Sequence, residues 1–276
     1  MKIIEAAAEA GASGYTFSTH PINLQILAEL KHSDMLKDEF ELYPVLPYAQ
    51  GYVRLANEKG MRGLVNETLS KLSALDRART VIETGFSALK LDAIGLMKSY
   101  LDLELQAYLK PENSNIRSVL LHEVVTDLCL GLRNVHLLGA FAQHIRERYH
   151  ASPGFVTYNL VRFVEVFREA GLALKDTTIM TPFNSIGYQM SQSRQSCEDC
   201  LSVLNEGDVI AMSIMAGGYS KLDEAVNYIS GLPKLFGVAV GVSSEEQARG
   251  TFAKLRTWFR NQPHTSTLSE RGTCSD

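Results

Sequence analysis

The pair His122-Glu123 carries the side chains best suited to move a proton, and it directly follows the apolar run SVLL. A short, uniformly apolar run is expected to be a buried strand, which brings the residues at its end to the edge of a sheet. Histidine titrates near neutral pH, and burial can bring a carboxylate into the same range. We therefore predict His122 and Glu123 as the catalytic acid and base, at the end of a strand over 118–123. Because neighbouring strand residues point to opposite faces, only one of the two should face the site.

Polar side chains also end or follow several other apolar runs. They are His20 in STHP, Gln50 after YPVLPY, Asn159 in VTYN and Asn184 in TPFN. We predict that these four residues bind substrate, with the asparagine amides acting as neutral donors to a developing oxyanion. The alternative for the asparagines is a bond to a loop backbone. For His122 and Glu123 the alternative is a bond to a helix N-terminus or to water.

Metal-ligating residue types are present, but their spacing predicts no metal site. His20, His122 and Glu123 are types of side chain that bind divalent metals, yet such distant positions do not predict convergence. Cys197 and Cys200 form a single C-x-x-C pair without the further ligands that zinc needs. We therefore predict no firm cofactor, and a divalent metal at the three residues stays an alternative.

Small residues follow two apolar runs near the C-terminus, VIAMSIM (209–215) and FGVAVGV (236–242). The candidates are Gly217, Gly218, Gly241, Ser243 and Ser244. Glycine lets a backbone N–H approach an anion closely, and a serine cap marks a helix N-terminus with partial positive charge. We predict that these five residues bind phosphate. The alternative is that the glycines only permit tight turns and that the serine is only a cap.

Apolar strand patterns alternate with helical patterns along most of the chain. The seven expected strands cover 14–21, 42–48, 118–123, 154–159, 177–183, 209–215 and 236–242. Most are apolar on both faces, which is typical of a parallel sheet covered by helices. The first and last expected elements are both helices, whereas an eight-fold barrel begins with a strand. This pattern predicts an α/β fold of the (β/α)8 TIM-barrel type that lacks its first strand, which would make Met1 an internal start or the sequence a fragment.

A long helical stretch and a polar chain end are the remaining features of the sequence. We predict a helical insert near 76–110, one barrel domain over 1–260, and a disordered polar tail over 261–276. An open doubly wound sheet is the alternative fold, but its usual G-x-G-x-x-G turn is not found in the sequence.

The segment VIAMSIMAGG followed by FGVAVGVSS resembles the closing third of aldolase-type TIM barrels that hold a phosphorylated ligand. The resemblance implies a ligand phosphate near Gly217, Gly218, Gly241 and Ser243. No lysine ends an expected strand, because Lys175 precedes one strand and Lys221 begins a helix. The chain thus departs from aldolases that work through a lysine imine.

Composition excludes several classes of protein. The 276 residues carry a net charge of −4 without a long basic run, which argues against nucleic acid and anionic membrane as partners. The apolar runs are shorter than the roughly 20 residues that span a bilayer. Four cysteines in this length form no disulfide framework, so we predict a cytoplasmic location.

These observations predict an enzyme of the lyase or isomerase type. It would use acid/base chemistry on a small phosphorylated or carboxylated carbonyl metabolite, without a lysine imine. The alternative is a non-catalytic TIM-barrel protein that binds a ligand or forms a homo-oligomer. In that alternative, apolar residues of the helical insert would pack against another subunit, namely Ile82, Phe86, Leu89, Ile94, Met97 and Leu101.

Overall fold

The computed structural model describes residues 1–30, 40–47, 93–108, 115–233 and 235–260. Two compact units are present: one comprises Met1 and Ser13–Gly241, and the other Lys2–Ala12 and Val242–Asp276. The predicted disordered tail and the part of the helical insert before residue 93 lie outside the described residues. One domain over 1–260 stays a prediction.

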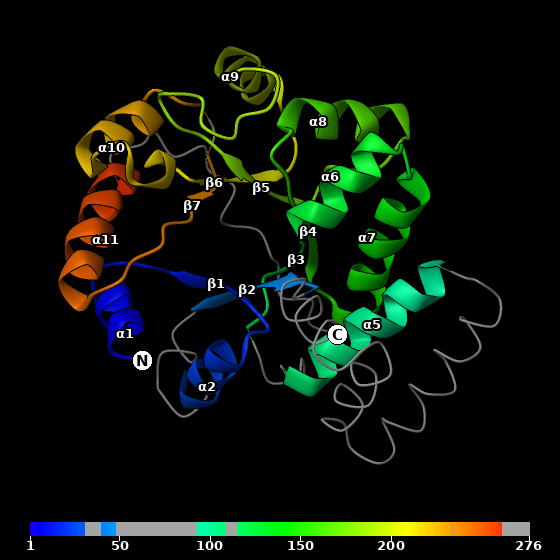
Figure 1. The fold of residues 1–276 in the computed structure, drawn as a ribbon, viewed down its shortest axis with the longest axis horizontal. Coiled ribbons are helices and arrows are strands. Elements are labelled where there is room, and N and C mark those ends of the chain that lie inside the picture. Colours follow the sequence, from blue (N-terminus) through cyan, green and yellow to red (C-terminus); the bar gives the residue numbers. More distant parts are fainter. Residues whose placement is uncertain (31–39, 48–92, 109–114, 234, 261–276) are drawn as a thin grey trace, which may run out of the picture. The chain divides into compact units, whose positions relative to one another are not determined.

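The first unit holds a sheet of seven parallel strands in sequential order, β1 to β7 (Figure 1). The strands are β1 Gly14–Ser18, β2 Glu41–Leu46, β3 Ser118–Leu121, β4 Ser152–Val156, β5 Thr178–Pro182, β6 Asp208–Met212 and β7 Gly237–Val238. The sheet curls into a half-barrel, which confirms the TIM-like α/β class. Sequential order also rules out the doubly wound alternative, which needs a reversal of strand order. Within the described residues the barrel is not a closed, eight-stranded one.

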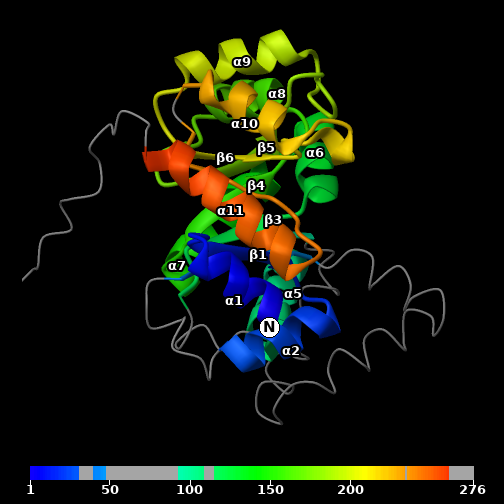
Figure 2. The same ribbon diagram turned by 90° about the vertical axis from the view of Figure 1, so that its left-hand side faces the viewer.

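Helices alternate with these strands and cover the outer side of the curl. They are α2 Pro21–Leu30, α5 Ala93–Tyr108, α6 Glu123–Gly131, α7 Val135–Tyr149, α8 Leu160–Glu169, α9 Arg194–Val203 and α10 Leu222–Ser230, with a short 3-10 turn, η3, at Ala216–Gly218. In Figure 2, α8 and α9 lie on the outer side of β5 and β6. Most strands are shorter than expected by two or three residues, because helix caps and turns begin directly after the buried part.

The outer face of the sheet is held by aromatic packing. Phe155 of β4 contacts Phe141 of α7 and both Phe163 and Phe167 of α8, with ring centroids 5.1 to 5.3 Å apart. Leu160, Phe163 and Phe167 recur at three- and four-residue spacing, so one stripe of α8 is buried against the sheet. Such aromatic pairs contribute about 0.5–1.5 kcal/mol each beyond their buried area.

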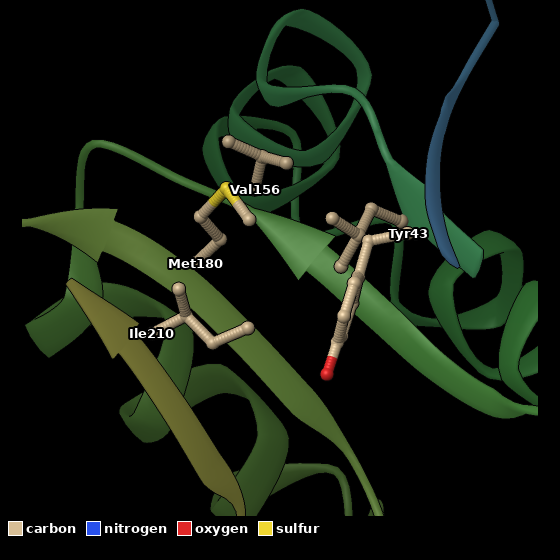
Figure 3. Packing of buried hydrophobic residues seen from close by; sticks show 5 residues of the cluster. Tyr43, Val156, Met180 and Ile210 are labelled. Atoms are coloured by element: carbon tan, nitrogen blue, oxygen red, sulfur yellow. The ribbon is translucent and has the colours of Figure 1, made fainter. Parts of the chain in front are cut away.

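The inner face of the curl has its own buried cluster. Figure 3 shows side chains from neighbouring strands meeting there. Its members are Tyr43, Leu120, Val156, Met180 and Ile210, one from each of β2 to β6. In the register, Leu120 pairs with Gly154, and a Cβ on that glycine would lie 2.2 Å from Leu120 Cδ2. The missing side chain at Gly154 therefore leaves the room that Leu120 fills.

A charged network crosses the inside of the curl at the amino ends of the strands. Arg117, just before β3, lies 3.3 Å from the Asp208 carboxylate at the start of β6 and 3.7 Å from Glu41 at the start of β2. Tyr43 donates a 2.5 Å hydrogen bond to Glu41. The arginine also lies over the ring of Phe236, 5.6 Å from its centroid. In a flat sheet, β3 and β6 would be about 14 Å apart, so this contact requires the curl.

The second unit pairs two helices, α1 Lys2–Glu9 and α11 Glu245–Arg260. Ala6, Ala7 and Ala248 are buried between them, and their small side chains allow close packing. Glu9 and Arg249 form an ion pair across the same two helices.

We expect Arg117→Met to lower the free energy of unfolding by about 1–2 kcal/mol at neutral pH, since charge-assisted hydrogen bonds contribute in this range and partial exposure reduces it. Urea unfolding measures the change. Arg162→Met is the matched control, because Arg162 pairs with Glu165 of its own helix at 3.5 Å. Removal of such a pair should change stability by less than about 0.5 kcal/mol.

The effect of Arg117→Met should also depend on pH. Burial raises the pKa of Asp208 above its ordinary value, and Arg117 lowers it, so loss of the arginine raises this pKa further. A carboxyl group whose pKa is higher in the folded state than in the unfolded state loses folding stability as the pH rises between the two values. The variant should therefore fall further behind the wild type between about pH 4 and pH 7. A stability difference that stays constant over this interval would contradict the assignment.

Candidate functional site

His122 and Glu123 meet at the carboxyl end of β3, and the expected alternation of their side chains is wrong. The strand ends at Leu121, Glu123 is the first residue of α6, and His122 is the N-cap of that helix. The turn from strand to helix brings His122 Nδ1 within 3.2 Å of Glu123 Oε2. Alternation applies only while the backbone is extended, so it could not predict this contact.

The ring nitrogen of His122 has two partners that require opposite protonation states. Nδ1 lies 3.3 Å from the backbone nitrogen of Val124, a donor that needs the free lone pair. The Glu123 carboxylate on the same nitrogen needs a proton between the two atoms. The side chains of His122 and Glu123 are 18% and 23% exposed, so solvent reaches both. The two contacts therefore exclude one another at any one protonation state of this nitrogen.

Asp127 of α6 supports the loop after β4. Its carboxylate accepts hydrogen bonds from the Thr157 hydroxyl and, at 3.1 Å, from the backbone N–H of Tyr158. Burial raises the pKa of Asp127, and these two bonds lower it. The carboxylate thus fixes the backbone from which the Tyr158 side chain extends.

Tyr158 joins the site from the end of β4, and sequence reasoning missed it. Burial, followed by the charges of Glu123 and Asp127, raises the pKa of its phenol. The phenol therefore stays protonated, and can donate, at neutral pH. The motif VTYN contained Tyr158, but β4 ends at Val156, so strand alternation gave no signal for the direction of this side chain.

The two asparagines predicted to bind substrate are engaged in loop structure. Asn159 caps α8 and accepts a 3.1 Å hydrogen bond from the backbone of Arg162. Asn184 is fully buried, donates to the carbonyls of Tyr188 (2.8 Å) and Ser213 (3.3 Å), and accepts from Tyr188 N–H at 2.7 Å. These contacts match the structural alternative, while a substrate-binding role for either residue stays a prediction.

The remaining candidates are spread over several elements. His20 Nδ1 accepts from Ile22 N–H at 3.2 Å, at the start of α2, and Gln50 lies outside the described residues. His20, His122 and Glu123 do not converge: within the described ranges, no group of three or more His, Cys, Asp or Glu could hold a metal ion.

The residues predicted to bind phosphate fall in both units. In the first unit, Gly217 and Gly218 have positive φ angles of 68° and 94°, and the Gly218 N–H bonds the Met215 carbonyl at 2.9 Å. In the second unit, Ser244 caps α11 by accepting from Gln247 N–H at 3.1 Å, as predicted. Ser243 donates both its N–H and its hydroxyl to Gln247 Oε1, each at 2.9 Å. Gly241 follows β7, which is only two residues long. Phosphate binding stays a prediction.

The comparisons with known proteins give no match. No family model matches the chain, and neither the curated proteins nor the solved structures searched show a significant likeness to it. No helix in the described part of the chain is long and apolar enough to cross a membrane. Any function inferred for the chain therefore rests on the geometry of the site.

We expect Asn184→Ala to lower the free energy of unfolding by about 2–3 kcal/mol, because it leaves buried backbone groups of the loop without partners. Chemical denaturation measures the loss. Asn134→Ala is the control: this exposed asparagine caps α7 with one 3.3 Å bond from Leu137 N–H. Loss of such a cap lowers the free energy of unfolding by about 1 kcal/mol. Equal losses in both variants would show that Asn184 does not stabilise the loops through its buried hydrogen bonds.

Proposed function

We propose that the chain is an enzyme of the lyase or isomerase type that moves a proton on a small carbonyl metabolite. The observation that carries the proposal is the contact of 3.2 Å between His122 Nδ1 and Glu123 Oε2 at the carboxyl end of β3. Catalytic groups of TIM-like folds come from these strand ends. A solvent-accessible imidazole and carboxylate, with the Tyr158 phenol just after the adjacent strand β4, form a sufficient set of groups for proton transfer.

Each group has a distinct role in the proposed step. Glu123, assisted by His122, removes the proton from the carbon next to the carbonyl. The Tyr158 phenol donates to the carbonyl oxygen as negative charge develops on it, which replaces the role first predicted for the asparagines. Reversal of both transfers, to the same or to the neighbouring carbon, completes exchange or isomerisation. No lysine in the described part of the chain ends a strand, so the proposed step uses no imine.

The test needs no knowledge of the overall reaction. Removal of a carbon-bound proton in D2O replaces it with deuterium, which proton NMR detects as a loss of signal. We expect catalysed exchange with at least one member of a panel of dihydroxyacetone, dihydroxyacetone phosphate, glyceraldehyde 3-phosphate and pyruvate. Glu123→Gln should slow the exchange by about 100-fold to 10,000-fold, the usual contribution of a placed acid or base. His122→Asn should also slow it.

His136→Asn is the control, because this histidine is exposed on α7. Its exchange rate should equal that of the wild type. Full activity in the double variant His122→Asn, Glu123→Gln would show that the proton is moved elsewhere. A protein that binds members of the panel but exchanges none of their protons would favour the alternative of a non-catalytic binding protein.

We extend the proposal to a phosphate on the substrate, held by the turn that contains Gly217 and Gly218. If phosphate binds only the folded state, it should raise the melting temperature as its concentration increases. Gly218→Asp should abolish this rise by charge repulsion. Gly218→Ala is its control, since it imposes the same backbone strain at a φ of 94° without a charge. A rise that survives Gly218→Asp would place the anion elsewhere.

The proposal of an oligomer has less support. In the described part of the helical insert, Leu101 is buried and Ile94 and Met97 are partly buried in α5. This burial fits packing of the insert within the protein rather than against a second subunit. Ile82, Phe86 and Leu89 lie outside the described residues.

A further inference from the structure

The loops after β5 and β6 hold an unusual concentration of left-handed backbone. Of the seven described non-glycine residues with positive φ, four lie there: Gln189 (58°), Gln192 (72°), Ser213 (52°) and Ala216 (49°). This conformation costs about 1–2 kcal/mol for a residue with a side chain, and glycine avoids the cost. Clusters of such residues are typical of functional sites.

Two of these strained residues direct polar side chains to the same place. The Ser213 hydroxyl donates to Gln189 Oε1 at 3.5 Å, and the Ser191 N–H of the same loop donates to the Tyr158 carbonyl at 2.9 Å. Gln189 is exposed and Ser213 is partly exposed. The strained loops therefore place an amide and a hydroxyl together, beside the loop that carries Tyr158.

An aromatic ring borders the same place. Tyr188 is 44% exposed, and a Cβ built on Gly217 would lie 3.8 Å from its ring, so this ring spans the two loops. Both backbone groups of Tyr188 are bound by the buried Asn184. Asn184 thus fixes the backbone that carries the half-exposed ring.

The loops themselves are neutral. Residues 183–193 (FNSIGYQMSQS) and 213–220 (SIMAGGYS) contain no charged side chain. The nearby Arg194 is engaged elsewhere: it donates to the Ser185 carbonyl and lies 3.2 Å from Glu198. The side chains of these loops therefore offer only neutral hydrogen bonds and contact with a ring, beside the Gly217-Gly218 backbone proposed above for a phosphate.

We propose that the loops after β5 and β6 bind the hydroxyl groups of a polyhydroxylated carbonyl compound, a substrate of the sugar type. A hydroxyl both donates and accepts, as do the Gln189 amide and the Ser213 hydroxyl. The C–H face of a sugar packs against an aromatic ring such as Tyr188. This inference rests on the proposed function, because it names the substrate class of the same site.

The test measures binding of neutral probes without turnover. Dihydroxyacetone, xylose and glucose are titrated by calorimetry and by saturation-transfer NMR, with pyruvate and inorganic phosphate as anionic probes that carry no alcohol group. We expect at least one neutral polyol to bind, and its affinity to fall tenfold or more in Gln189→Gly and in Tyr188→Ala. Leu132→Ala is the control: this apolar side chain is 71% exposed at the C-cap of α6, and its loss should leave binding unchanged.

The melting temperature of Gln189→Gly provides a second readout, because it should not fall when polyol binding falls. Gln189→Gly relieves the left-handed strain, so its melting temperature should equal or exceed that of the wild type while polyol binding is lost. Binding lost together with stability would overturn the inference, as would the absence of binding by all three polyols, or equal binding by wild type and Gln189→Gly.

The outcomes for this inference and for the proposed function are separable. Polyols that bind without deuterium exchange would retain the inference and reject the acid/base function. Exchange on pyruvate without polyol binding would retain the function and reject the inference. Glu123→Gln should keep polyol binding and lose exchange if both are correct.

Discussion

The ion pair between Arg117 before β3 and Asp208 at the start of β6 joins two strands that a flat sheet would keep apart. The guanidinium also reaches Glu41 at the start of β2, so one side chain links strands on both sides of the curl. Directly above this network the inner face is apolar, with Leu120 and Ile210 among its buried residues. Charge at the amino ends and apolar packing above it together hold the geometry that lets the loops at the carboxyl ends meet.

Most polar side chains at the carboxyl ends hold these loops in place. Asn184 binds backbone groups on two loops, and Asp127 fixes the turn that carries Tyr158. A buried amide or carboxylate whose bonds are all made within the protein has little capacity left for a ligand. The side chains that can still form hydrogen bonds to a ligand are those on the loops that Asn184 and Asp127 hold in place, above all Tyr158 and Gln189. This division explains why Asn159 and Asn184, which the sequence singled out, make contacts within loops.

The two ends of the half-barrel differ in charge. At the amino end, the charged side chains of Arg117, Asp208 and Glu41 contact one another and serve stability. The carboxyl end carries strained, uncharged loops in which Gln189 and Ser213 adopt left-handed conformations. Strain of this kind lowers stability and persists only where the surroundings enforce it, as Asn184 does here. A site built in this way trades stability for fixed positions of its side chains.

The sequence by itself determined the class of fold, because burial of a strand on both faces and the spacing of helical stripes are local properties. Seven parallel strands in sequential order, the cap at Ser244 and the helix around Cys197 agree with such patterns. Only the tertiary structure decided which side chains meet. The contact of His122 with Glu123 arises from a change of backbone conformation between adjacent residues, and Gln189 meets Ser213 across 24 residues of chain. The bridge from Arg117 to Asp208 spans 91 residues and exists only because the sheet curls. Such contacts depend on the geometry of the whole sheet, which no local pattern of residues contains.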